Sequence, residues 1–243
     1  MRALLAPDIV RMWEAGRDQR PIERALSLLS AADASSSREE LMALSVSRRD
    51  FRLLELRQRA FGDTLQAFAE CPQCAGHLDI RFGAAAIKTA KNEAPSILEL
   101  KAHGITVQFR LPTSADLTEA VAAGDIQVAS ETLLSLCVIE ARKDGTTIAP
   151  QELPSEVTEE INRRMAASDP VAEVQLDLRC PLCSHSWQAL FDIASFLWME
   201  ISAHARRLLR EVDALARAYG WGEAEILGLS ATRRQAYLEL IGS

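Results

Sequence analysis

Two short cysteine motifs constrain this chain more than any other feature of its sequence. Cys71–Cys74 and Cys180–Cys183 both read Cys-Pro-X-Cys, so each places two thiols three positions apart on a tight turn. That spacing is typical of half of a tetrahedral zinc site. Residues 78–82 and 187–191, after the motifs, alternate between apolar and polar, and so do residues 174–178. Because alternation predicts strands, we interpret the motifs as two zinc knuckles that meet around one structural Zn(II).

The distance between the motifs is unusual, because 105 residues separate Cys74 from Cys180. Ribbon-type sites commonly use about 15–20 residues here. Closing the longer loop adds only about 1.5 kcal/mol, since the entropic cost grows by about 0.6 kcal/mol per doubling of its length. Structural zinc contributes about 10–16 kcal/mol in small zinc domains, so the metal outweighs the loop. The predicted metal ligands are Cys71, Cys74, Cys180 and Cys183.

Other interpretations of the cysteines stay open at this point: a redox dithiol, two sites that each combine cysteines with His77 or His185, or cysteines without a joint role. A thioredoxin-like motif needs a helix that lowers the thiol pKa, whereas strand-like alternation follows both motifs here. Neither histidine has a second histidine further on, so we expect both at the surface. The fifth cysteine, Cys137, lies in an apolar run and is predicted to be a buried thiol.

Composition and charge bound the class of protein. The 243 residues are 48% apolar with a net charge of −7, as in many globular proteins. Residues 71–179 hold 10 Lys/Arg and 16 Asp/Glu, which argues against broad binding to nucleic acid. Pro7 and Asp8 interrupt the first residues before a secretory segment develops, and no apolar run approaches the about 18 residues of a membrane span. We expect a cytoplasmic protein without membrane contact, whose reducing compartment suits paired cysteines.

Helical patterns dominate both ends of the chain. Residues 7–45 predict short helices, and residues 47–61 predict a helix that carries five arginines. We interpret that helix as a solvated face balanced by Asp50 and Glu55, with a docking face for an acidic partner as the alternative. Residues 194–219 predict a long helix, followed by shorter ones over 223–227 and 230–240.

Between the motifs the pattern includes strands. Residues 97–100 and 105–111 predict a hairpin across His103 and Gly104. A strongly apolar helix is then expected to reach about Ala141. These elements predict a folded insertion between the two knuckles.

The predicted fold is α+β and mostly α-helical. The two distant CPxC knuckles form a small zinc-ribbon-like β unit, which holds N-terminal helices, a helical insertion with its β-hairpin, and a C-terminal helical hairpin. The predicted regions are residues 1–70 (N-terminal helices), 71–192 (zinc-ribbon-like unit, with an inserted α/β segment over 84–170) and 193–243 (C-terminal helices).

The sequence contains no recognisable catalytic motif. A Gly-rich phosphate loop, a nucleophile elbow and an HExxH motif are all missing, so we expect a protein that is not an enzyme. The C-terminal helices resemble a helix-turn-helix in which Arg233 and Arg234 are the basic residues. A zinc-ribbon DNA-binding regulator is therefore the main alternative, although residues 180–243 carry a net charge of only −1.

Several short motifs are spread over nearly the whole chain. They are Arg48-Arg49-Asp50, Phe61-Gly62-Asp63, both CPxC motifs, Leu111 to Leu117, Asp192 to Trp198, Tyr219 to Ser230, and Arg233 to Leu238. Together they resemble the baseplate hub assembly chaperone family of T-even-type contractile phages, which has relatives in bacterial contractile injection system clusters. The resemblance implies a cytoplasmic assembly factor or baseplate component that binds hub, spike or tape-measure proteins. Candidate partner contacts, with helix–helix packing as their alternative role, are Trp221, Leu229, Tyr237 and Leu240.

Overall fold

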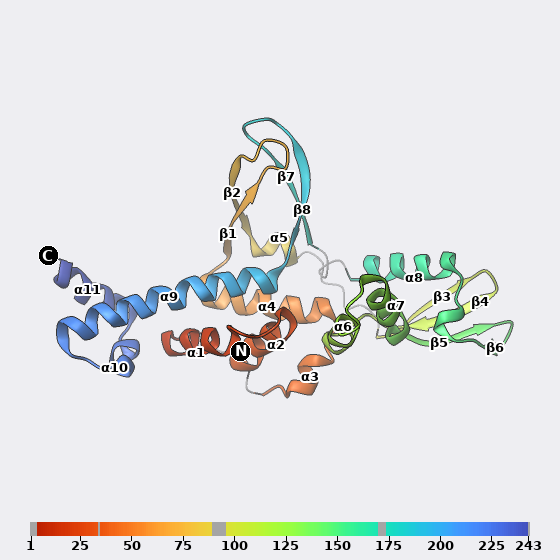
Figure 1. Cartoon of the computed structure of the whole chain (residues 1–243), viewed down its shortest axis with the longest axis horizontal. Coiled ribbons are helices and arrows are strands. Elements are labelled where there is room, and N and C mark those ends of the chain that lie inside the picture. Colours follow the sequence, from red (N-terminus) through yellow and green to blue (C-terminus); the bar gives the residue numbers. More distant parts are fainter. Residues whose placement is uncertain (1–3, 34, 89–95, 170–173, 243) are drawn as a thin grey trace.

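A computed structural model gives the fold and describes residues 4–33, 35–88, 96–169 and 174–242 (Figure 1). The chain is mixed α+β and mostly helical, as predicted. Within the described residues, no helix combines the length and hydrophobicity that crossing a bilayer requires. The helices are α1 (Ala6–Gly16), α2 (Pro21–Ala32), α3 (Arg38–Met42), α4 (Val46–Phe61), α5 (Ala84–Lys88), α6 (Ser114–Val121), α7 (Ile126–Cys137), the 3-10 helix η1 (Pro150–Glu152), α8 (Ser155–Ser168), α9 (Ile193–Tyr219), α10 (Glu223–Gly228) and α11 (Ala231–Gly242). The strands are β1 (Thr64–Glu70), β2 (His77–Gly83), β3 (Leu98–Ala102), β4 (Ile105–Phe109), β5 (Val138–Lys143), β6 (Thr146–Thr147), β7 (Val174–Arg179) and β8 (Ser186–Phe191).

The N-terminal helices pack against the long helix α9 to form the main core. Figure 1 shows α1, α2 and α4 beside α9, and all three contact it. The apolar stripe of α4 contributes the fully buried Leu53 and Leu56, and that of α9 contributes Leu197, Ile201 and Leu208. Burying a side chain of this size contributes about 1.5–3 kcal/mol. Segments from the two ends of the sequence therefore share one core.

Arg57 joins α4, β1 and α9 through a single buried guanidinium. It donates to both carboxylate oxygens of Glu200 on α9, at 2.9 and 2.7 Å. It also donates to the carbonyl oxygens of Gly62 and Thr64, where α4 ends and β1 begins. Because a bidentate pair fixes both partners in orientation, Arg57 sets the direction in which β1 leaves the helical body.

The arginine-rich helix α4 is not the solvated face that its sequence suggests. Arg49 and Arg57 are only 7% and 2% exposed, and they pair with Asp50 and Glu200 respectively. The predictions of a solvated face and of a docking face are therefore both wrong for these two arginines. Ion pairing offsets the cost of burying them; Asp50 is one of the acids expected to balance the helix, whereas the sequence does not reveal the pairing of Arg57 with Glu200. Arg48, by contrast, is exposed.

Two β-hairpins project from the helical body (Figure 1). β1 pairs antiparallel with β2, and β7 pairs antiparallel with β8. The bases of the hairpins pack into the main core, where the rings of Phe82 and Phe191 meet edge to face at a centroid distance of 5.4 Å. The strands β2, β7 and β8 are as predicted, but β1 has no counterpart among the predicted strands. Its less exposed side carries two alanines, and alanine is a weak strand signal.

The segment between the hairpins has a second core. Its sheet has the order β3-β4-β5-β6, and α8 packs on it through Val157 and Ile161, which share that core with Phe109. The predicted hairpin is confirmed as β3 and β4, with His103 and Gly104 in its turn. The insertion thus combines helices with a sheet; its predicted range, 84–170, includes residues outside those described.

The apolar helix of the insertion is shorter than predicted. α7 ends at Cys137, and the residues expected to continue it to Ala141 belong instead to β5. β5 pairs with β4, and its first residues, Val138 and Ile139, are β-branched. Branching at Cβ favours the pleated strand over the helix. Because β4 offers an edge with which these residues can pair, they form a strand instead of continuing α7.

The C-terminal helices agree with prediction. α9, α10 and α11 cover the expected segments, and Gly220 ends α9 in the left-handed conformation, with φ of 71°. The division of the chain into three regions stays a prediction.

Removing the carboxylate partner of Arg57 tests the junction of α4, β1 and α9. We expect Glu200→Ala to lower the free energy of unfolding by about 3 kcal/mol, because a guanidinium that is 3% exposed loses its counter-ion. Asp213→Ala is the matched control on the same helix, since Asp213 pairs with Arg217 where both side chains are largely exposed. The control should change stability by less than about 1 kcal/mol. Equal losses in urea denaturation of the two variants would contradict this role for Arg57.

Candidate metal centre

Each CPxC motif occupies the turn of one hairpin. In the first turn the amide of Cys71 donates to the carbonyl oxygen of Gly76 at 2.9 Å, and the amide of Ala75 donates to that of Cys71 at 2.9 Å. The second turn repeats both bonds at matching positions, at 2.8 and 3.0 Å. Ala75 and Ser184, also at matching positions, are both left-handed, with φ of 56° and 62°. The two turns therefore share one backbone geometry.

The four motif cysteines come together at the tips of the hairpins. All four sulfur atoms lie within 4.8 Å of one another. The Sγ atoms of Cys71 and Cys183 are 3.6 Å apart, and so are those of Cys74 and Cys180. A tetrahedral zinc site with Zn–S bonds of about 2.3 Å requires S–S separations of about 3.8 Å. The sulfur positions are thus close to those of a four-thiolate site, and the group could hold a metal ion.

The thiols differ in their exposure to solvent. Cys71 and Cys180 are each 1% exposed and share a small apolar cluster with Leu78. Cys74 and Cys183 are exposed. Each hairpin therefore contributes one thiol from its apolar side and one from the surface, which limits water to one side of the group.

Without a metal, the thiols perturb one another. The amides of Cys183 and Leu182 point at the thiol of Cys180 and lower its pKa to about 7. The amide of Gly76 acts in the same direction on Cys74, but the neighbouring thiols, Cys183 first, and burial outweigh it and raise the pKa of Cys74 to about 12. Like charges this close cannot all ionise alone. A bound cation removes that conflict, since it favours the thiolate form of every ligand.

The histidines near the motifs lie outside this group. His77 is exposed on β2, and the ring of His185 stacks on Trp187 at a centroid distance of 6.0 Å. Among the described residues, the one group of metal-binding side chains consists of the four cysteines. Two separate sites that combine cysteines with histidines are therefore not what the structure contains.

The fifth cysteine lies apart from the four. Cys137 is 1% exposed at the end of α7, so the prediction of a buried thiol is confirmed. Burial, followed by the nearby charge of Asp116, raises its pKa to about 12. It therefore stays protonated and inert near neutral pH.

The candidate contacts of the C-terminal helices divide between packing and exposure. The rings of Trp221 and Tyr237 pack on Tyr219, with centroids 4.7 and 5.6 Å away from it, so these two have a structural role. Leu240, in contrast, is 65% exposed, and Leu229 is half-buried.

One of the two basic residues on which the helix-turn-helix alternative depends is buried. Arg234 is 5% exposed and donates to Glu211 at 3.0 Å and to the carbonyl oxygen of Leu229. Only Arg233 of the pair is exposed, which leaves little for a DNA phosphate to contact.

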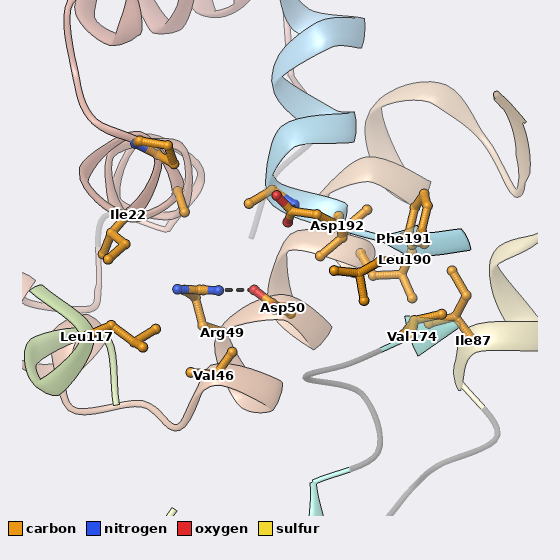
Figure 2. A pocket seen from close by; sticks show the side chains of 15 residues that line it. Ile22, Val46, Arg49, Asp50, Ile87, Leu117, Val174, Leu190, Phe191 and Asp192 are labelled. Atoms are coloured by element: carbon orange, nitrogen blue, oxygen red, sulfur yellow. Dashed lines mark hydrogen bonds and ion pairs between the residues drawn. The ribbon is translucent and has the colours of Figure 1, made fainter. Parts of the chain in front are cut away.

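A pocket of about 300 Å³ lies between α2, α4, α6 and the start of α9, and residues of α5, β7 and β8 complete its walls. Figure 2 shows the guanidinium of Arg49 pointing into it and pairing with Asp50, at 2.7 Å. Burial raises the pKa of Asp50, while Arg49 opposes that shift. The sequence gives no sign of this pocket, because its walls come from six segments that are far apart in the sequence.

The left-handed residue of the first turn provides a test of the turn geometry. Ala75→Gly should raise the free energy of unfolding by about 1 kcal/mol, because a φ of 56° is strained for alanine but not for glycine. Ala69→Gly, inside β1, is the matched control and should lower it by about 0.5–1 kcal/mol. Chemical denaturation of both variants gives the comparison, and a loss of stability in Ala75→Gly contradicts the turn described here.

Comparison with known proteins identifies the family. A family model described as T4 bacteriophage base plate protein matches residues 14–198, well over half of the chain and inclusive of both hairpins and the insertion. Neither a curated protein nor a solved structure matches the chain. The resemblance noted in the sequence is confirmed at the level of a baseplate protein, although the C-terminal motifs lie beyond the matched range. The chain belongs to the T4 bacteriophage base plate protein family.

Proposed function

We propose that Cys71, Cys74, Cys180 and Cys183 bind one structural Zn(II) and that the paired hairpins form a zinc-ribbon-like unit. Sulfur separations near those of a tetrahedron support four-coordinate binding. Thiolates prefer soft or borderline metals, and a set of four leaves no open position for substrate. The metal therefore serves structure and not chemistry.

A thiol redox protein is less well supported by the same geometry. In redox Cys-X-X-Cys motifs a helix N-terminus stabilises the thiolate. Both motifs here lie between antiparallel strands, and each thiol has three thiol neighbours. No helix dipole acts on either turn, so metal binding explains the cluster better.

The proposed function is non-enzymatic assembly of a contractile tail or injection-system baseplate. The family match over residues 14–198 carries this proposal. A baseplate protein interacts with other baseplate components, and we infer that the partners of this chain are hub, spike or tape-measure proteins. Leu240 at the exposed end of α11 is a candidate contact. The protein acts by binding, as a chaperone that holds subunits or as a component that stays among them.

Co-expression tests the proposed function directly. The chain, carrying an affinity tag, is expressed with the hub, spike or tape-measure protein encoded beside it, one at a time. A stoichiometric complex with at least one of them in gel filtration is the expected result. If each of the three elutes separately from the chain, the proposed assembly role is wrong.

Metal content tests the proposed zinc site. We expect about one zinc per chain in elemental analysis and native mass spectrometry. Cys180→Ser should lose the metal and unfold at lower denaturant, since metal binding contributes folding free energy. Cys137→Ser is the matched control, because Cys137 is as buried as Cys180 but lies outside the cluster, and it should retain the metal. Folded, metal-free wild type with four reactive thiols would contradict the site.

A further inference from the structure

The hairpin of α6 and α7 leaves apolar side chains in solvent. Val121, Ile126 and Val128 are 56%, 83% and 48% exposed around the turn between the two helices. Within α7, an apolar helix of 12 residues, Cys137 is the one buried residue. Single exposed apolar residues are ordinary, but three within eight positions are not. This end of the insertion has the character of an interface.

The segment that contains α6 and α7 carries only negatively charged side chains. From Leu111 to Ala141 the chain has no Lys or Arg and five Asp or Glu. Two of the five, Asp116 and Glu140, pair with arginines that flank the segment. The other three lie exposed and form no ion pair with any residue that the structure describes: Glu119, Asp125 and Glu131.

We propose that the turn and outer face of α6 and α7, around Val121, Ile126 and Val128, dock a basic amphipathic segment of another baseplate protein. Binding would bury the apolar side chains and so contribute affinity. The acids would favour a segment with lysines or arginines beside its apolar stripe. The inference deepens the proposed function and rests on it for the class of partner.

Charge decides against two other occupants. A second copy docked through the same face would bring Glu119, Asp125 and Glu131 of both copies into one contact, and like charges in a contact are unfavourable. An anionic lipid surface attracts basic segments and repels this one. A basic partner segment satisfies both the apolar and the acidic character of the surface.

Two model peptides test the surface without knowledge of the natural partner. Each is an amphipathic helix of about 14 residues with leucines at helical spacing, and lysines in one are replaced by glutamates in the other. By fluorescence anisotropy, the full-length protein should bind the lysine peptide about tenfold more tightly than the glutamate peptide. Ile126→Ser/Val128→Ser should weaken the lysine peptide about tenfold, and Phe68→Ser/Met199→Ser, at similarly exposed sites elsewhere, should change it less than about twofold.

The salt dependence of peptide binding tests the contribution of the acidic residues. Binding of the lysine peptide should weaken between about 50 and about 500 mM NaCl, and Glu119→Gln/Glu131→Gln should reduce that salt dependence. If the serine variants at the surface and at the control sites bind the lysine peptide alike, the proposed surface is wrong.

Co-expression separates this inference from the proposed function. A baseplate protein that binds wild type and Ile126→Ser/Val128→Ser equally would refute the surface and leave the assembly role intact. If none of the three baseplate proteins binds, but the lysine peptide still requires Ile126 and Val128, the assembly role fails and the basic-segment surface stands.

Discussion

The structure depends on the meeting of four thiols at the tips of two hairpins. Cys74 and Cys180 are 106 positions apart in sequence, yet their sulfurs are 3.6 Å apart. A two-stranded hairpin alone is marginally stable, so neither hairpin has the means to hold its tip against the other. A cation shared by all four sulfurs, as proposed, would supply that means, because it favours the thiolate form of every ligand and attracts all four.

The other end of the hairpins is fixed by the helical body. Arg57 ties the start of β1 to Glu200 on α9, and the rings of Phe82 and Phe191 join the hairpin bases to the main core. The second hairpin leads directly into α9, so packing fixes the base of the hairpins while the four thiols lie at their tips. The insertion has a core of its own, and its helix α6 contacts α2 and α3 of the helical body.

Elements that have a recognisable pattern in their own residues could be predicted from the sequence. The cysteine spacing, the alternation of β7 and β8, and the glycine that ends α9 are of this kind. β1 and β5 need a neighbouring strand to become strands, so their weak or helix-like patterns mislead. The burial of Arg49 and Arg57 also depends on tertiary contacts, one of them with Glu200 more than 140 positions away. The grouping of the four motif cysteines could be predicted because the spacing in each motif is strict, whereas the pocket around Arg49 could not.

X-ray absorption at the zinc edge of the purified protein tests whether one ion joins the two knuckles. Four sulfur scatterers at about 2.3 Å, without the outer-shell pattern of imidazole, are the predicted result. That coordination requires both knuckles to contribute to one ion in each chain of a monomeric sample. A mixed shell of sulfur and nitrogen, or two sulfurs with lighter atoms, would mean that the knuckles bind separately, and the account of one shared metal centre would be wrong.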